Sequence, residues 1–240
     1  PNRRTMHPNM VQGVRECVEF LTSLSPSEPI LFNKEIFQIT GPKPEWIDQP
    51  SPEIYVGATK PKMLSMATEV ADGLIMSDVT LARIDECMDV INQSIKDNGR
   101  DRKTFAISNL FSWHVKLDKE EAIAEARSKL FVRGMLDHWY TSTFLDSNES
   151  QIVEDNLHAF AEAYARNSND IKGVDDDIVE KLINNLTFTG NFNDIDRFTE
   201  EMIQFKNAGL DEFAIRLYKK PEQSMKVIAE RVVPYLEGNK

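Results

Sequence analysis

A short loop with one glycine and two lysines is the part of the sequence best suited to bind an anion. It follows the apolar run 54–56 and leads into a predicted helix that begins at Pro61. The start of a helix offers unpaired backbone N–H groups and the positive end of the helix dipole, and a glycine lets the backbone come close to a phosphate. We therefore expect an anion there, with a plain turn that binds nothing as the alternative. The residues of this loop are Gly57, Ala58, Thr59, Lys60, Pro61 and Lys62.

Polar residues also stand where two other predicted strands end. Ser77 and Asp78 follow the apolar run 74–76, where they either line the same site as the loop or cap the next helix. Arg216 and Lys219 flank the end of the last predicted strand. They are placed either to meet an anionic group or to form an ordinary solvated rim.

His114 is the one histidine placed to meet a bound substrate, because it lies near the end of the predicted strand 105–115. An imidazole at that position is suited to donate a proton in catalysis. The alternative is a histidine that is buried or at the rim and only structural. Asn109 and Ser112 lie on the same strand.

The composition excludes several classes of protein. The formal net charge is −11, the acidic residues are spread along the chain, and no Lys/Arg stripe interrupts them, so a nucleic acid would be repelled. No apolar run approaches the roughly 18 residues that span a bilayer, and no apolar signal segment opens the sequence. We expect neither nucleic acid nor membrane as a partner, and a cytoplasmic location.

The cysteines and the catalytic motifs give no further function class. Cys17 and Cys87 lie in helical patterns without metal-ligand spacing, which predicts buried free thiols and no metal site. The sequence contains no Ser/His/Asp order, no Cys/His pair, no HExxH, no Walker motif and no GxGxxG pattern. Hydrolase, metalloenzyme and kinase functions are therefore not predicted.

The order of the predicted elements indicates an α/β fold. Short apolar runs without polar alternation are separated by amphipathic helices, which is typical of a parallel sheet covered by helices. Before them come a helix after Pro8 and a hairpin over 30–41 that turns at Asn33-Lys34. The expected strands are 54–56, 74–76, 105–115 and 213–217, and the expected helices are 61–71, 81–95, several within 119–186, 193–207 and one from Pro221.

Four ordered motifs carry a family resemblance: 15–19 (Arg-Glu-Cys-Val-Glu), 34–41, 54–64 and 71–73 (Ala-Asp-Gly). In this order and at these spacings they resemble the luciferase-like monooxygenase superfamily. The branch they are most similar to is that of the deazaflavin-dependent methylenetetrahydromethanopterin reductases. The run 190–236 also resembles the last helix–strand–helix unit of that family.

The resemblance implies a TIM-barrel (β/α)8-type fold of which this chain holds only the C-terminal half. The predicted strands would be strands 5–8, and 119–186 would be a helical insertion within a single domain that spans 1–240. On this interpretation the chain is an N-terminally truncated member. Strands at the two ends of such a half-barrel would have open edges, so we expect a homo-oligomer, most simply a dimer.

The same resemblance implies a flavin- or deazaflavin-dependent oxidoreductase that transfers a hydride to or from a small-molecule substrate. The cofactor would be an 8-hydroxy-5-deazaflavin coenzyme or FMN, with its phosphate held by residues 57–62. Ser77 is added to the cofactor site only because of its position at the end of a predicted strand. The family usually has a second glycine where Lys60 stands. A positive φ there would strain the lysine, whereas its ammonium group would add charge to the site. A non-catalytic half-barrel that at most binds a phosphorylated ligand is the alternative function.

Overall fold

The computed structural model describes residues 9–49 and 51–238, which form two compact units. Unit 1 takes the described residues up to Ile75 together with Asp89–Ala106. Unit 2 takes Met76–Met88 and the described residues from Ile107 onward. Three elements contribute residues to both units: β4 (Gly73–Ser77), α3 (Leu81–Asp97) and β5 (Ala106–Lys116).

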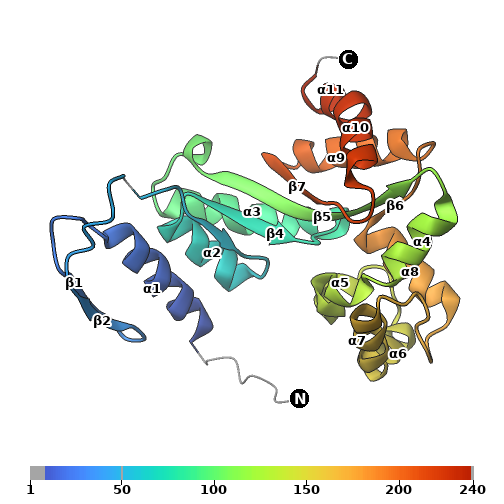
Figure 1. The fold of residues 1–240 in the computed structure, drawn as a ribbon, viewed down its shortest axis with the longest axis horizontal. Coiled ribbons are helices and arrows are strands. Elements are labelled where there is room, and N and C mark those ends of the chain that lie inside the picture. Colours follow the sequence, from blue (N-terminus) through green and yellow to red (C-terminus); the bar gives the residue numbers. More distant parts are fainter. Residues whose placement is uncertain (1–8, 50, 239–240) are drawn as a thin grey trace. The chain divides into compact units, whose positions relative to one another are not determined.

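Unit 1 opens with a helix and a hairpin (Figure 1). Helix α1 (Met10–Ser23) packs against α2 (Pro61–Val70). Strands β1 (Ile30–Asn33) and β2 (Gln38–Gly41) pair antiparallel. The predicted hairpin is confirmed, but residues 34–37 form its turn, so it is wider than a turn at Asn33-Lys34.

Glu16 holds this hairpin turn from inside unit 1. Its carboxylate accepts hydrogen bonds from the backbone N–H groups of Glu35, Ile36 and Phe37 at 3.1, 2.9 and 2.9 Å. Burial pushes the pKa of Glu16 upward, but hydrogen bonds from Gln12 and from the turn outweigh it and lower the pKa overall. The first two motifs of the resemblance are therefore joined through one carboxylate.

The first strand–helix–strand unit confirms the parallel arrangement. Strand β3 (Tyr55–Gly57) pairs parallel with β4, with Tyr55 opposite Gly73 and Gly57 opposite Ile75. Helix α2 connects them, and its inner face buries Leu64, Met66 and Ala67. The short 3-10 helix η1 (Arg102–Thr104) precedes β5.

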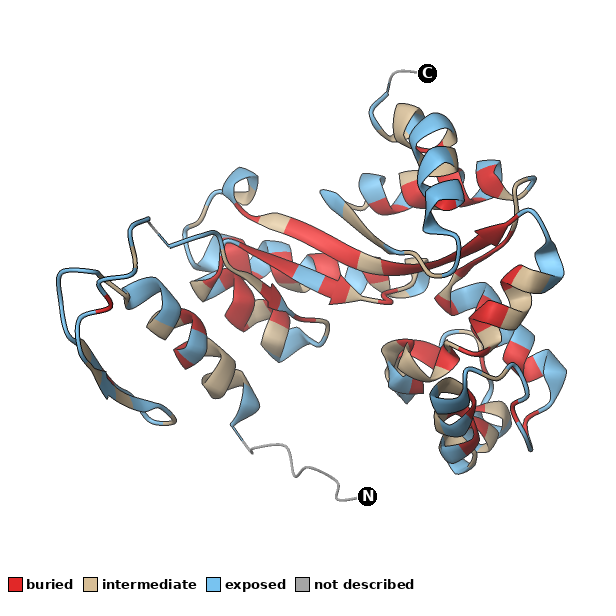
Figure 2. Ribbon diagram, in the orientation of Figure 1, coloured by how far each residue is buried: buried red, intermediate tan, exposed pale blue. Residues whose placement is uncertain are grey.

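In unit 2, strand β5 is the central strand and is buried along most of its length (Figure 2). It pairs parallel with β7 (Glu212–Arg216) through residues 108–112 and with β6 (Phe188–Asn191) through residues 113–116. The four predicted strands are thus confirmed as β3, β4, β5 and β7. Strand β6 was not predicted, because its sequence Phe-Thr-Gly-Asn has a single apolar residue and no alternation.

Aromatic side chains fill the space between β5 and helix α9 (Ile195–Asn207). Phe111 and Trp113 project from one face of β5, and their rings meet Phe188, Phe198 and Phe205 at centroid distances of 4.9–5.9 Å. The opposite face of β5 carries the polar residues of the candidate site. The final helices are α10 (Pro221–Arg231), with Pro221 at its N-terminus as predicted, and α11 (Val233–Leu236).

The segment 119–186 is helical throughout its regular elements, as predicted, and has its own apolar core within unit 2. Leu130, Phe160, Val179 and Leu182 are among the most deeply buried residues of this core. Its elements are α4 (Lys119–Arg127), η2 (Leu130–Val132), η3 (Gly134–Leu136), α5 (His138–Thr141), α6 (Ser147–Asp155), α7 (Leu157–Arg166) and α8 (Asp176–Leu186).

The two thiols differ in exposure. Cys87 is buried as predicted, and burial raises its pKa to about 12. Cys17 is exposed, so the prediction that both are buried is wrong for this residue, which lines an open groove beside α1. Within 9–49 and 51–238, no helix is long and apolar enough to cross a membrane.

Candidate functional site

The predicted anion-binding loop lies in unit 1 between β3 and α2. Ala58 is buried and its N–H donates to Ile75 O at 3.0 Å, so this donor already has a partner. Gly57 is exposed, and a Cβ atom built there would have no other atom within 4 Å. Pro61 is the first residue of α2 and has no N–H. The loop therefore has open space at Gly57 and a helix start beside it, but fewer backbone donors than its length suggests.

Lys60 occupies its position without strain. It is the N-cap of α2 with φ −92° and ψ 151°, in the extended region that any residue adopts. Its carbonyl oxygen accepts from Met63 N at 2.9 Å and Leu64 N at 3.0 Å, as in an ordinary first helical turn. Because φ is negative at Lys60, the strain expected from a positive φ is absent at this residue. Lys60 and Lys62 are both exposed.

In unit 2, Ser77 and Asp78 lie at the end of β4, and Asp78 belongs to a buried ion pair. Asp78 is 4% exposed and its Oδ1 lies 2.7 Å from Nη1 of Arg133, which is 2% exposed. Its Oδ2 accepts from Gly134 N at 3.0 Å and from the Ser77 hydroxyl at 2.9 Å. Asp78 thus forms a buried ion pair that joins the end of β4 to the insertion.

The backbone around this ion pair is unusual. Asp78 has φ +56°, and Gly134, Met135 and Leu136 are three consecutive left-handed residues with φ of +53°, +52° and +54°. A Cβ atom on Gly134 would lie 2.6 Å from the ring of Tyr140. Glycine is required there for two reasons, its φ angle and the close approach of that ring. Burial raises the pKa of Asp78, and the Arg133 guanidinium opposes that rise.

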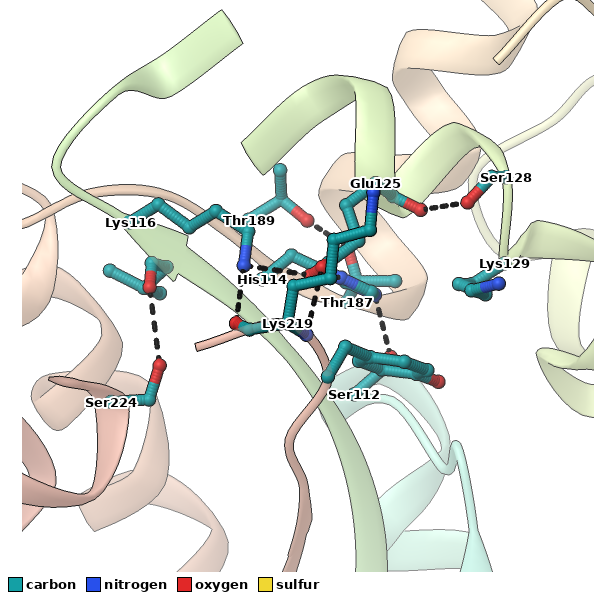
Figure 3. A network of polar contacts seen from close by, with 12 residues as sticks. Ser112, His114, Lys116, Glu125, Ser128, Lys129, Thr187, Thr189, Lys219 and Ser224 are labelled. Carbon is teal, nitrogen blue, oxygen red and sulfur yellow. Dashed lines mark hydrogen bonds and ion pairs between the residues drawn. The ribbon is translucent and has the colours of Figure 1, made fainter. Parts of the chain in front are cut away.

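His114 is fully buried at the centre of a hydrogen-bonded chain (Figure 3). Its Nδ1 lies 2.9 Å from Oε2 of Glu125 on α4, and its Nε2 lies 2.8 Å from the Ser112 hydroxyl on β5. Alternate residues of a strand point to the same face, which is why Ser112, His114 and Lys116 share this side of β5. Lys116 Nζ lies 3.1 Å from the same Glu125 oxygen.

The loop after β7 closes this network. Lys219 N–H donates to Oε1 of Glu125 at 3.1 Å, and Lys219 O accepts from Lys116 Nζ at 3.0 Å. The Tyr218 ring stacks on the His114 imidazole with centroids 4.6 Å apart, and its hydroxyl lies 3.4 Å from Ser112 Oγ. The guanidinium carbon of the exposed Arg216 lies 5.3 Å from the centroid of the Tyr218 ring.

Burial and the Glu125 carboxylate act on the pKa of His114 in opposite directions, and burial has the larger effect. Burial lowers the pKa of His114, while the hydrogen bond and charge of Glu125 oppose the change. Burial raises the pKa of Glu125, but the contacts with His114 and Lys116 lower it overall. A neutral imidazole beside an ionised carboxylate carries its proton on Nδ1, so Nε2 accepts the hydrogen bond from Ser112.

The connected residues Ser112, His114 and Glu125 have the hydrogen-bond order of an acyl-transfer triad, an order that no sequence motif marks. They differ from a working triad because Ser112 is 1% exposed and its hydroxyl is lodged between His114 and Tyr218. We therefore describe the arrangement as a buried polar network and not as a catalytic triad.

Glu125 was missed because sequence spacing carries no sign of it. It lies on the insertion helix α4, eleven residues after His114, among other acidic residues typical of an exposed helix. Asn109, by contrast, is structural: its amide is buried and pairs with the backbone N and O of Val79 at 3.3 and 3.0 Å.

A cavity of about 390 Å³ in unit 2 lies next to this polar face. Ser112 and Asp78 both line it, together with Thr80 at the start of α3 and Glu201 on α9. Burial raises the pKa of Glu201, with Arg197 opposing the rise. The volume is in the range of small-molecule sites. Of the predicted site residues, Ser77 and His114 lie in unit 2, and the loop 57–62 lies in unit 1.

The state of His114 predicts how stability depends on pH. The pKa of His114 is lowered in the folded protein. Below about pH 6.5, His114 therefore binds a proton in the unfolded chain but stays neutral in the native protein. The free energy of unfolding should then fall by up to about 1.4 kcal/mol per pH unit below that value. Urea unfolding of wild type and His114→Gln between about pH 7.5 and 5.5 measures this, since the variant should lack that part of the slope. Equal slopes would contradict the buried neutral imidazole.

Comparison with known proteins places these features in a family. The sequence profile of luciferase-like monooxygenases matches residues 3–212. The 5,10-methylenetetrahydromethanopterin reductase of Archaeoglobus fulgidus is 25% identical over 231 residues, which make up 95% of this chain and 67% of that protein.

Solved structures show the same fold at low identity. The coenzyme F420 dependent tetrahydromethanopterin reductase of Methanopyrus kandleri superposes with a TM-score of 0.66 at 17% identity, over 94% of this chain and 62% of that one. The oxygenating constituent of 3,6-diketocamphane monooxygenase from Pseudomonas putida, solved with FMN, gives 0.52 at 18% identity, over 94% and 63%. The chain thus spans about two thirds of the length of these proteins. Because the family profile covers most of its residues, the chain belongs to the luciferase-like monooxygenase family.

Proposed function

We propose that this protein is a flavin- or deazaflavin-dependent oxidoreductase that acts on a small-molecule substrate. The observation that carries the proposal is the family match over 3–212, which includes the loop 57–62 and the polar face of β5. One relative is described as coenzyme F420 dependent and another was solved with FMN. In such enzymes the cofactor supplies the hydride chemistry, and the protein supplies binding, orientation and electrostatics.

We also propose that the fold is the C-terminal half of a TIM barrel. Strands β3, β4, β5 and β7 would be strands 5–8 of the barrel, and 119–186 would be an insertion in a single domain that spans the chain. The parallel pairing of β3 with β4 and of β5 with β7 supports this assignment. The C-terminal ends of barrel strands form the active-site face, and the loop 57–62, Ser77 and His114 all stand near such ends.

The residues of the loop fit the phosphate of such a cofactor. Gly57 leaves room for a ligand to approach the backbone, and Thr59 and Lys60 lead into the start of α2. Lys60 and Lys62 are exposed cations within a chain whose net charge is −11. Ser77 would line the site because it stands at the end of β4. Its hydroxyl donates to Asp78.

The loop assignment predicts a charge-dependent affinity. Reversing the charge with Lys60→Glu should weaken cofactor binding by about 10-fold or more, which corresponds to about 1.4 kcal/mol. Isothermal titration of FMN and of the deazaflavin coenzyme into wild type and variant measures the change. Lys96→Glu, on the exposed last turn of α3, is the matched control and should bind as wild type does. Equal affinity of Lys60→Glu and wild type would remove this loop from the site.

The proposed setting is cytoplasmic, with no nucleic acid partner, in line with the acidic composition. We propose in addition that the chain forms a homodimer. In the described part of the chain β3 pairs only with β4, and an apolar groove of about 720 Å³ runs between β3 and α1 in unit 1. Val14, Leu21 and Val56 line this groove. An open strand edge and exposed apolar area are both features that a second copy would cover.

Sedimentation velocity at micromolar concentration tests the dimer. We expect a single species of twice the chain mass, and a Val14→Glu variant should shift it toward the monomer. The half-buried Glu19 on the same helix offers a control, because it lies outside the groove and Glu19→Gln removes only its ion pair with Lys34. A stable monomer that does not aggregate would contradict the proposed assembly.

A further inference from the structure

Three basic side chains of unit 2 gather near the end of β7, and we call them the cation cluster. Arg216 is the last residue of β7, Lys219 lies in the loop that follows, and Lys129 comes shortly after helix α4 of the insertion. In the described part of the chain none of the three forms an ion pair with a carboxylate. Because acidic residues outnumber basic ones by 39 to 28 in this protein, three such cations in one neighbourhood need an explanation.

The sheet register places Arg216 on the polar face of β5. Arg216 is the parallel partner of Ser112, and partner residues of neighbouring strands point to the same face of a sheet. The Arg216 guanidinium carbon lies 5.3 Å from the centroid of the Tyr218 ring, which itself stacks on His114. The guanidinium therefore lies on the side of the sheet that carries the polar network, and not on the side that packs against α9.

Lys129 and Lys219 reach the same region from two other segments (Figure 3). Burial lowers the pKa of the half-buried Lys129, and the positive charges of Lys219 and Arg216 lower it further, while Glu125 opposes the change. The three cations are thus close enough to repel one another. An anion bound among them would relieve this repulsion.

Neutral groups, rather than a carboxylate, hold Lys129 in place. Its Nζ donates to Asn167 Oδ1 at 2.6 Å and lies 5.4 Å from the centroid of the Tyr164 ring. Asn167 lines a hollow of about 170 Å³ together with Ser128 and Lys219. The structure thus provides an open space beside the cation cluster.

Two carboxylates also line this hollow, and both already have partners. Glu125 accepts from Lys116 Nζ and from the backbone N–H of Lys219. Glu121 accepts from Lys220 Nζ at 3.0 Å. Neither carboxylate is paired with a side chain of the cation cluster, so the positive charge of the cluster is available to a ligand.

We propose that Arg216, Lys219 and Lys129 bind a phosphate group of the substrate. The assignment to the substrate rests on the oxidoreductase function proposed above, in which the loop 57–62 holds the phosphate of the cofactor. A phosphate monoester carries a charge of about −1.5 to −2 at pH 7 and three strong acceptor oxygens, which three cations can neutralise and hydrogen-bond. A carboxylate offers a single negative charge, so it would leave most of the positive charge uncompensated.

The first test needs no cofactor. Inorganic phosphate is titrated into ¹⁵N-labelled protein at low ionic strength, and the Nε–H signal of Arg216, assigned by its loss in Arg216→Gln, is followed. We expect this signal to move with phosphate, and the Kd to rise by about 10-fold in Lys219→Gln because one of the three charges is lost. Lys219→Gln keeps the backbone N–H that donates to Glu125.

Lys226→Gln is the matched control, since Lys226 is an exposed lysine on α10 outside the cation cluster. It removes the same charge and should leave the Kd for phosphate unchanged. Acetate should bind about 10-fold more weakly than phosphate. An Arg216 signal that does not respond to phosphate, an equal Kd in wild type and Lys219→Gln, or acetate that binds as tightly as phosphate would overturn the phosphate site.

The second test uses cofactor-loaded protein and separates the two sources of a phosphate group. Phosphate should bind the loaded protein about as tightly as the cofactor-free protein, and Lys219→Gln should bind the cofactor as wild type does. If the cofactor excludes phosphate and Lys219→Gln weakens cofactor binding, the cluster holds the phosphate of the cofactor and the assignment to the substrate is wrong. If wild type binds neither cofactor, the oxidoreductase function fails together with that assignment, while the first titration still decides whether the cluster is a phosphate site.

Discussion

Replacing Asp78 by asparagine is expected to lower the free energy of unfolding by about 3 kcal/mol or more. The change leaves the Arg133 guanidinium, which is 2% exposed, without a counter-charge, and an uncompensated buried charge is strongly destabilising. Asparagine tolerates the left-handed backbone of this position, where φ is +56°, so the loss reports the charge and not the turn. Urea unfolding at neutral pH measures the difference.

Two further variants distinguish the cost of an unpaired buried charge from the loss of any ion pair. In the double variant Asp78→Asn with Arg133→Met no charge remains buried, and stability should return close to wild type. Asp176→Asn removes one member of an ion pair whose carboxylate is 85% exposed, and should cost less than about 1 kcal/mol. If Asp78→Asn were as mild as Asp176→Asn, the buried ion pair would not fasten the insertion.

The second large effect is expected on catalysis. His114→Gln fills much of the same space and still forms hydrogen bonds, but it cannot carry a proton between its two ends. We expect kcat of the cofactor-loaded enzyme to fall by about 10²-fold for the substrate that wild type turns over, with cofactor affinity unchanged.

His158→Gln is the control for this experiment, because His158 is exposed on α7. Its kcat should equal that of wild type. A decrease of less than a few-fold in His114→Gln would return His114 to a purely structural role, in which it fastens α4 to β5 through Glu125.

The parts of the fold that could be predicted from the sequence are those with a local pattern. The apolar runs at β3, β4, β5 and β7 and the stripes of the helices between them are periodic signals, and all of them form the expected elements. Strand β6 has no such pattern and exists because β5 extends beyond β7 and offers residues 113–116 for pairing. Its position depends on a tertiary contact, which no local signal records.

The candidate site divides in the same way. The loop 57–62 and the position of His114 follow from strand ends, which the sequence marks. The partners of these residues do not: Glu125, Arg133 and Tyr218 come from the insertion and from the loop after β7, many residues away in the chain. The pair Ser77-Asp78 before a predicted helix is typical of a helix cap. The left-handed φ of Asp78 and its buried ion pair with Arg133 depend on tertiary structure, which the local sequence does not record.

The proposed function is tested most directly by cofactor binding. Purified protein is incubated separately with the oxidised deazaflavin coenzyme and with FMN, passed over a desalting column, and its absorbance spectrum is recorded. We predict that one of the two remains with the protein at about one molecule per chain, and that Lys60→Glu retains less of it than Lys96→Glu does. If the protein emerges free of both cofactors, and titration calorimetry likewise detects no binding, the oxidoreductase proposal is contradicted for this chain.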